Sequence, residues 1–571
     1  MNKSEKRKIG FLKICMGVLF AGILAKLFCV QILDHDEYVA KAREQHVSEN
    51  VIPASRGEIY MMDGQEAVKV VMNETVFTVI FDPLIVDEEK VKEILEKYAK
   101  DNLVAKWEDV FSDKTRRYYV VARNVNYQNA KKIEEEELVG VYFEKTIKRV
   151  YPEGEMASGL LGFVNADGVG QYGVEGAFNG KLAGTDGSLK SVRDVNGIAL
   201  SIGDENIEKP AVDGEDVYLS VDRNIQTKIE KILMEKVDNS DATNASAIVL
   251  DPNTGKVLAM ANVPNYDPAN YGNVKDAGAY INYVLEEAYE PASVCKTLTF
   301  AAGVDMGLIN RDTTYYNTLE MTVDGLTFHN VHEGFQGQTI TLQRALNYSL
   351  NTGSATVLKM IGGGEFNEEG RTKLYEYLRK FGLGQYTGIE LYEVPGLVPT
   401  PNEYQYTMDY TYATMTFGQG MNMTLLQLAA AYAAVINGGI YRTPTILETR
   451  ENEAREERVI SEEASAEMRE FLRGVRIVLR NNGIDKAGYF IGGKTGTGQV
   501  VLEDGSYSVA TEETIATYAG FGGAEGELPR YLVLVKVWGD GHYFGGEDDA
   551  QPLFNQISDY LLTYLKIQPN L

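Results

Sequence analysis

Residues 290–297 read Glu-Pro-Ala-Ser-Val-Cys-Lys-Thr and precede an apolar pattern that predicts a helix. Pro291 suits the first turn of that helix. Positions three apart share one helix face, so Ser293 and Lys296 are expected to lie one turn apart and within reach of each other. A neutral lysine can take the proton of a serine hydroxyl and activate it as a nucleophile. A capping serine followed by a surface lysine is the other interpretation.

The start of this helix is expected to favour the neutral amine. Its positive dipole end disfavours another cation, and its free backbone N–H groups can hold an oxyanion. Cys295 lies beside the pair and is a second candidate nucleophile. We predict that it is a buried packing residue, because a cysteine nucleophile usually needs a histidine base and the chain has only five histidines.

Length and composition limit the possible classes of protein. The chain has 571 residues, enough for two to four domains, and its 44% hydrophobic and 24% charged residues are typical of globular protein. The net charge of −27 argues against nucleic acid and against a broad anionic membrane surface as partner.

An N-terminal apolar segment, residues 14–33, is long enough to span a bilayer. No small-x-small cleavage site follows it, so we predict an uncleaved anchor and not a signal peptide or a buried core helix. Basic residues precede it, which predicts a cytoplasmic N-terminus and an exported chain after Asp34. Cys15 and Cys29 lie in the segment, which leaves Cys295 without an intramolecular disulfide partner outside the membrane.

The domain organisation follows from a change in the sequence pattern along the chain. We predict a cytoplasmic tail (1–13), the anchor (14–33), a mixed β-rich domain (34–211) and a larger domain (212–571). The larger domain opens with strands, continues with helices and closes with strands. This order predicts an α+β fold with helices on an antiparallel sheet.

Two helix starts carry clear capping signals. Asp222 is predicted to cap a helix over residues 224–236. Thr424 and Gln427 form a capping-box pattern before an alanine-rich helix that Asn437 and two glycines end. The alanine-rich helix is predicted to be structural.

A second motif, Ser349-Leu350-Asn351, lies between a predicted helix over 342–347 and another that begins near Thr352. In a tight bend, the hydroxyl and the carboxamide can face one cavity, the first to relay a proton and the second to hold a substrate amide. Such a triplet also occurs by chance in a long chain.

A third motif, Gly-Gly-Lys-Thr-Gly-Thr-Gly at 492–498, follows the strand-like residues 489–491. Its glycines permit another backbone to approach closely. Lys494 adds a positive charge, and the hydroxyls of Thr495 and Thr497 can bind a carboxylate. A glycine-rich turn is the alternative, and the spacing is not that of a phosphate-binding loop.

In the order S-x-x-K, S-x-N, K-T-G-T, the three motifs resemble those of the serine acyltransferases that react with penicillin. Residues 251–260 look like the hairpin that precedes the nucleophile in penicillin-binding proteins. Residues 417–420, with Thr424 and Gln427, are similar to the block between the second and third motifs.

The resemblance continues outside this domain. Residues 56–59, 161–164, 173–175 and 184–187 resemble parts of the pedestal of class B penicillin-binding proteins, closest to the division (septal) branch. None of the departures from the usual pattern removes a catalytic group. They are Ala292, often Gly, Thr297, often Pro, and Met61-Met62, where an Asp-Arg pair is common.

The resemblance implies an α+β penicillin-binding transpeptidase fold, with helices on both sides of an antiparallel sheet, on a β-rich pedestal behind a transmembrane helix. It implies a peptidoglycan D,D-transpeptidase of septal wall synthesis in the bacterial cell membrane. Stem peptides ending in D-Ala-D-Ala and β-lactams are its expected ligands, and a membrane glycosyltransferase and division proteins its expected partners. No nucleic acid, cofactor or metal is expected. A D,D-carboxypeptidase, a β-lactamase and a non-catalytic envelope scaffold or β-lactam sensor are the alternatives.

The resemblance also implies roles for single residues. Ser293 attacks the penultimate D-Ala with Lys296 as base, and Ser349 relays a proton to the leaving D-Ala. Asn351 holds the donor peptide, and Lys494 supplies a positive field. The backbone N–H groups of Ser293 and Thr497 form the oxyanion hole. The expected catalytic residues are Ser293, Lys296, Ser349, Asn351 and Lys494, and the expected substrate-binding residues are Thr495, Gly496 and Thr497.

Overall fold

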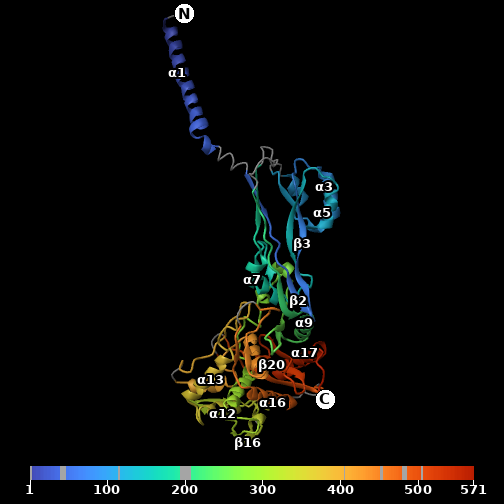
Figure 1. Ribbon diagram of the computed structural model, residues 1–571, viewed down its shortest axis with the longest axis vertical. Coiled ribbons are helices and arrows are strands. Elements are labelled where there is room, and N and C mark those ends of the chain that lie inside the picture. Colours follow the sequence, from blue (N-terminus) through green and yellow to red (C-terminus); the bar gives the residue numbers. More distant parts are fainter. Residues whose placement is uncertain are drawn as a thin grey trace. The chain divides into compact units, whose positions relative to one another are not determined.

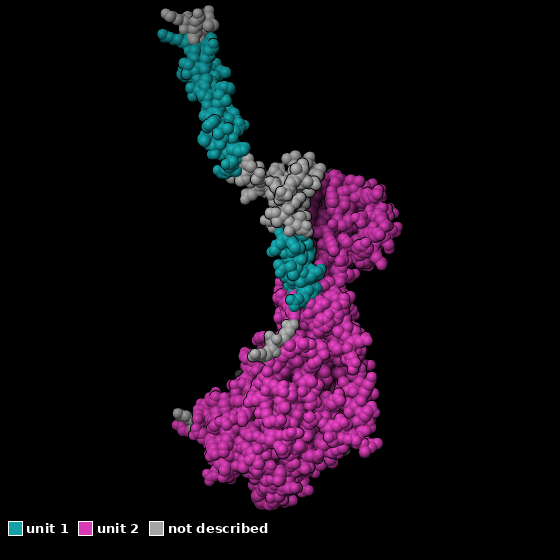
Figure 2. Space-filling model, in the orientation of Figure 1, with its two compact units in different colours: residues 1–57, 183–215 teal, residues 58–182, 216–571 magenta. Residues whose placement is uncertain are grey.

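The computed structural model divides the chain into two compact units, residues 1–57 with 183–215 and residues 58–182 with 216–571 (Figures 1 and 2). Each unit is described by itself. The described residues are 3–38, 47–112, 116–192, 207–332, 334–403, 406–450, 454–478, 485–502 and 506–571.

The first unit contains the apolar N-terminal helix α1 (Lys3–Phe28), which continues into a π-helical turn, η1 (Cys29–Leu33). Within the span Arg7–Leu33, an 18-residue window reaches a mean hydropathy of 2.1, and the span is by length and composition able to cross a membrane. The predicted anchor lies inside it. The unit also has an antiparallel sheet of β1 (Val47–Ile52), β8 (Gly187–Val192) and β9 (Ile207–Lys209).

The second unit begins with a mixed sheet in which the long strand β3 carries both β4 and β5. Strand β10 pairs in parallel with β2, although more than 150 residues separate them, and the other pairs are antiparallel. Helices α3 (Glu88–Tyr98), α4 (Trp107–Ser112) and α5 (Tyr127–Glu134) contribute to a separate apolar core on this sheet. The strands are β2 (Ile59–Asp63), β3 (Glu66–Phe81), β4 (Tyr119–Asn126), β5 (Val141–Val150) and β10 (Val217–Asp222).

A buried ion pair joins this sheet to the short helix α7 (Gly173–Ala177). Nε of Arg149 on β5 donates to Oε1 of Glu175 at 2.7 Å, and the two side chains are 6% and 0% exposed. The helix approaches closely because Gly173 has no side chain: a Cβ there would lie 2.2 Å from the carbonyl oxygen of Leu160. The packing therefore accounts for the Gly-Val-Glu sequence at 173–175.

We expect Glu175→Gln to destabilise the protein by about 2–3 kcal/mol, because the buried guanidinium loses its charged acceptor. Glu88→Gln is the control: its carboxylate pairs with Lys92 at an exposed i,i+4 site, where a change within about 0.5 kcal/mol is expected. Denaturant unfolding of both variants measures the difference. Equal midpoints would show that the buried pair adds no stability.

The larger sheet of the second unit is five-stranded and antiparallel throughout, in the order β12-β11-β21-β20-β19. Alternate residues of each strand face opposite sides. On β11, Ala247 and Val249 pack with α9 and α17, whereas Ile248 and Leu250 face the core that contains α10, α15 and α16. The strands are β11 (Asn244–Leu250), β12 (Val257–Val263), β19 (Tyr489–Gln499), β20 (Thr514–Ala524) and β21 (Tyr531–Trp538).

Helices thus cover both faces of this sheet, and the predicted fold class is confirmed (Figure 1). The hairpin expected at 251–260 is the β11–β12 pair. The main helices are α9 (Arg223–Asp238), α10 (Lys296–Asp305), α11 (Leu342–Asn347), α12 (Asn351–Ile361), α13 (Glu368–Lys380), α14 (Met408–Met415), α15 (Leu425–Ile436), α16 (Glu462–Val478) and α17 (Gln551–Tyr564). Three two-stranded ribbons join them, β13 (Thr314–Asn317) with β16 (Gln338–Thr341), β14 (Glu320–Val323) with β15 (Leu326–His329), and β17 (Ile440–Arg442) with β18 (Glu456–Arg458).

Both predicted helix caps are present. The Asp222 carboxylate accepts from the backbone N–H groups of Asn224 and Ile225 at the start of α9. Thr424 and Gln427 form a full capping box on α15, which Asn437 ends. Every residue of α15 is buried, so this helix runs through the core beneath the site described next.

Candidate active site

The segment that carries Ser293 begins with a 3₁₀ turn, η5 (Ala292–Cys295), and Lys296 is the first residue of α10. The sequence predicted one α-helix that carries both Ser293 and Lys296. The structure instead has a 3₁₀ turn at the serine, followed by the α-helix. Ala292 has a φ of +51°, so the chain makes a left-handed step directly before the serine. Cys295 is fully buried, and burial raises the pKa of its thiol, as a packing residue requires.

The second motif lies in the predicted bend. Helix α11 ends at Asn347, α12 begins at Asn351, and Ser349 has a φ of +55° between them. This turn brings the Ser349 hydroxyl and the Asn351 amide to the amine of Lys296.

The buried amine of Lys296 is the centre of the site. Its Nζ lies 2.8 Å from Oγ of Ser293, 2.7 Å from the backbone oxygen of Ser349, 3.1 Å from Oγ of Ser349 and 2.7 Å from Oδ1 of Asn351. The backbone oxygen and the amide oxygen can only accept hydrogen bonds. A neutral amine that donates to both therefore keeps its lone pair for a serine hydroxyl.

Two causes lower the pKa of Lys296 well below its usual range: burial comes first, and the charge of Lys494 second. The expected neutral amine is thus explained by desolvation and a second lysine, where the sequence suggested a helix dipole. Burial also lowers the pKa of Lys494 to about 7, against an opposing effect of Glu547. Near neutral pH, the site can hold one neutral and one charged amine.

The third motif is part of strand β19, which runs through all of Tyr489–Gln499 at the edge of the sheet. The glycine-rich turn that was the alternative for 492–498 is therefore wrong. The expected close approach is present: a Cβ on Gly496 would lie 2.5 Å from the backbone oxygen of Pro291, and one on Gly498 would lie 2.6 Å from that of Glu290. Glycine lets this strand contact the turn that carries Ser293.

The polar side chains of β19 contact different neighbours. Nζ of Lys494 lies 3.1 Å from Oγ of Ser349 and 3.0 Å from the backbone oxygen of Thr495. Oγ1 of Thr497 accepts from the backbone N–H of Gly546 at 3.0 Å, and the side chain is exposed, so its own proton can be donated to a ligand.

The Asn351 amide is bound on both sides by protein groups. Its oxygen faces Lys296, and its Nδ2 donates to the backbone oxygen of His329 at 2.8 Å. The structure places this side chain beside the amine. Because Nδ2 carries a second N–H, the contact with a substrate amide that the sequence suggested stays a prediction.

Two residues of the site were missed by the sequence analysis. The Glu290 carboxylate accepts from the backbone N–H of Gly420 at 2.9 Å and from the hydroxyl of Tyr507 at 3.1 Å. The hydroxyl of Tyr432 on α15 donates to the backbone oxygen of Val294 at 2.5 Å. Glu290 stands in the quoted stretch, but Tyr432 is 138 residues away from Val294 and no local pattern indicates it.

A serine hydroxyl beside a buried amine, next to the edge strand of an antiparallel sheet, is the arrangement of a serine-type acyltransferase. Two family descriptions match the chain: "Penicillin binding protein transpeptidase domain" over residues 245–559, and "Penicillin-binding Protein dimerisation domain" over residues 51–219.

Known proteins agree with these matches. Penicillin-binding protein PbpB of Mycolicibacterium smegmatis is 32% identical over 73% of this chain and 65% of its own length. Peptidoglycan D,D-transpeptidase FtsI of Escherichia coli is 30% identical over 80% of this chain and 74% of its own length. The crystal structure of penicillin-binding protein 2X from Streptococcus thermophilus shares the fold, with a TM-score of 0.72 at 24% identity over 91% of this chain and 80% of that one.

The chain belongs to the penicillin-binding proteins, as a class B member of the division type. The predicted family, fold class and enzyme class are confirmed.

Proposed function

We propose that the protein is a serine-type peptidoglycan D,D-transpeptidase of septal wall synthesis, and that the cleft described above is its active site. The observation that carries this proposal is the amine of Lys296, which lies 2.8 Å from Oγ of Ser293 and 3.1 Å from Oγ of Ser349. One buried amine can thus take a proton from the first hydroxyl and pass it to the second.

In the acylation step, neutral Lys296 accepts the proton of Ser293, and Oγ attacks the carbonyl of the penultimate D-Ala. The bond from that carbonyl to the terminal D-Ala nitrogen breaks. Lys296 returns the proton through Oγ of Ser349 to the leaving amine. Lys494, 3.1 Å from Oγ of Ser349, favours this relay by its positive charge.

Strand β19 is suited to hold the donor peptide. It is an edge strand, so an extended peptide can bind along its free side. We assign the hydroxyls of Thr495 and Thr497 to the terminal carboxylate and Gly496 to the close approach of the strand. The backbone N–H groups of Ser293 and Thr497 are assigned to the oxyanion.

An acceptor amine from a second stem peptide then attacks the acyl ester, and Ser293 recovers its proton through Lys296. The amine makes a cross-link, whereas water would make a shortened peptide.

The test separates these two outcomes. Full-length protein in detergent is incubated with a stem pentapeptide ending in D-Ala-D-Ala and an acceptor tripeptide, and the products are identified by mass spectrometry. We expect released D-Ala together with a cross-linked dimer. Released D-Ala with hydrolysed tetrapeptide alone would identify a carboxypeptidase.

We expect acylation by a penicillin to have a bell-shaped pH profile. At low pH Lys296 is protonated and cannot accept a proton, and above about pH 7 Lys494 loses its charge. The second-order acylation rate constant reports these groups in the free enzyme. Arginine stays charged, so Lys494→Arg should lose the decline at high pH while it keeps the decline at low pH. A decline near pH 7 that persists in this variant would exclude Lys494.

For the whole chain, we propose a single-pass bacterial membrane protein with a cytoplasmic N-terminus. The apolar helix and the basic residues before it support this orientation. We also propose a pedestal over 34–211 and a transpeptidase domain over 212–571, which the two consecutive family matches support. A membrane glycosyltransferase and division proteins are the proposed partners.

A further inference from the structure

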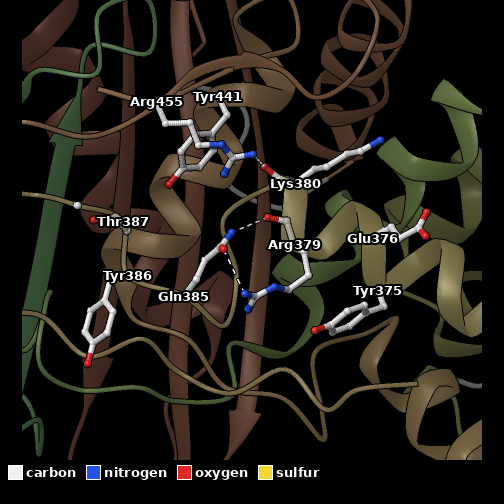
Figure 3. Close-up of a pocket in the computed structure, with 10 residues that line it drawn as sticks. Tyr375, Glu376, Arg379, Lys380, Gln385, Tyr386, Thr387, Tyr441 and Arg455 are labelled. Carbon is white, nitrogen blue, oxygen red and sulfur yellow. Dashed lines mark hydrogen bonds between the residues drawn. The ribbon is translucent and has the colours of Figure 1, made fainter. Parts of the chain in front are cut away.

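A cavity of about 570 Å3 lies away from the cleft, between the C-terminal end of α13, the loop 381–388 that follows it, and the β17–β18 ribbon (Figure 3). None of its lining residues belongs to the three motifs. Its walls include Tyr375, Arg379, Gln385, Tyr386, Tyr441 and Arg455.

The guanidinium of Arg379 is fixed in this cavity by three hydrogen bonds. Nη1 donates to the backbone oxygens of Leu383, at 3.1 Å, and Gly384, and Nη2 donates to Oε1 of Gln385 at 3.2 Å. In return, Nε2 of Gln385 donates to the backbone oxygen of Arg379 at 2.6 Å. The loop therefore holds the guanidinium in one orientation (Figure 3).

Arg379 keeps two donors after these bonds, because a guanidinium has five N–H groups. They are the N–H of Nε and one N–H of Nη2, a parallel pair that matches the two oxygens of a carboxylate or phosphate. Among the residues that the structure describes, no acceptor is recorded for Nε, and no carboxylate forms an ion pair with Arg379. These oriented donors make a preformed site for an anion.

Tyrosine side chains also line this cavity. Tyr386 is 67% exposed, and Tyr441 is buried with the guanidinium of Arg455 stacked 4.4 Å from its ring centroid. Figure 3 shows that the carboxylate of Glu376 and the ammonium of Lys380 point away from the Arg379 guanidinium. The cavity thus contains a planar cation and one exposed tyrosine ring, Tyr386, which suits the apolar face of a sugar ring.

We propose that this cavity binds a carboxylate-bearing saccharide of the cell wall, such as a muropeptide, with the carboxylate on Arg379 and a sugar ring against Tyr386. The choice of a wall saccharide rests on the proposed function. The site is separate from the cleft, so it would hold a strand of the substrate polymer while the stem peptide reacts elsewhere.

The experiment measures binding of a disaccharide muropeptide to the full-length protein by calorimetry. Ser293 is first acylated with unlabelled penicillin, so the cleft is filled. Arg379→Lys keeps the charge but loses the parallel donor pair, and Tyr386→Ala removes an exposed ring; each is expected to weaken binding at least about tenfold. Tyr392→Ala, a 72% exposed tyrosine outside this cavity, is the matched control and should bind as the unaltered protein does.

Equal binding by all four proteins, or no binding by the unaltered one, would overturn the proposal. Equal binding of a neutral N-acetylglucosamine disaccharide would exclude the carboxylate contact. Binding of a glycerol phosphate oligomer in place of the muropeptide would assign the cavity to a phosphate polymer and also overturn the proposal. All four proteins should still react with fluorescent penicillin; loss of that reaction in the unaltered protein would count against the proposed function and not against the cavity.

Discussion

Replacing Ser293 by alanine is expected to abolish covalent labelling of the protein by fluorescent penicillin. The label forms an ester with the attacking oxygen, and no other group can replace that oxygen in the same position. Ser293 is half-exposed and loses a single atom in this change, so the fold should persist. Gel fluorescence after incubation of the full-length protein measures the label, and thermal unfolding verifies the fold.

Two controls identify the nucleophile. Cys295→Ala should keep full labelling, because this thiol is buried and burial raises its pKa. Ser349→Ala should label more slowly, by about 10²–10⁴-fold, since it removes a proton relay and not the attacking atom. Labelling that survives in Ser293→Ala, or that disappears in Cys295→Ala, would contradict this assignment.

Replacing Gly418 by alanine is expected to destabilise the protein by more than about 4 kcal/mol and to remove acylation. Gly418 has a φ of +83°, which costs an alanine about 1–2 kcal/mol. In addition, a Cβ there would lie 2.2 Å from the backbone oxygen of Ala292, directly before the nucleophile. The nearest atoms to the new Cβ are all backbone atoms of Ala292, so no flexible side chain can move aside to relieve the contact.

Gly420→Ala is the matched control, because this glycine has a similar φ of +79° but its nearest neighbour, Oγ1 of Thr414, would lie 3.4 Å from the new Cβ. It should show only the conformational cost of about 1–2 kcal/mol. Denaturant unfolding and the acylation rate are measured for both variants. Equal losses would mean that the contact with Ala292 does not matter.

Local sequence signals predicted a good part of the fold. Asp222 and the Thr424–Gln427 box mark helix starts because their side chains satisfy free N–H groups of the first turn, a requirement that depends only on neighbouring residues. Strand β10 is different. Its parallel pairing with β2 joins segments more than 150 residues apart, and no local pattern encodes such a partner.

The active site likewise combines features that local sequence predicts with features that depend on distant residues. The bend at Ser349 follows from two adjacent helices, and the three motifs together indicated the family. The extent of β19 was missed because glycines normally weaken a strand, whereas here the turn that carries Ser293 packs directly on it. The cause of the low pKa of Lys296 was also missed, since burial and a second lysine 198 positions later are properties of the folded chain.

Helix α15 has a consequence for how the nucleophile can be altered. Its first turn is tied to the loop after α13, where Nε2 of Gln427 donates to the backbone oxygen of Gln385 at 2.7 Å. Five residues later, the hydroxyl of Tyr432 donates to the backbone oxygen of Val294. Helix α15 thus connects the backbone directly after the reactive serine with the loop that follows α13. Substitutions in its interior can change how fast a β-lactam reacts without touching the drug, so an inventory of cleft residues alone would underestimate the routes to resistance.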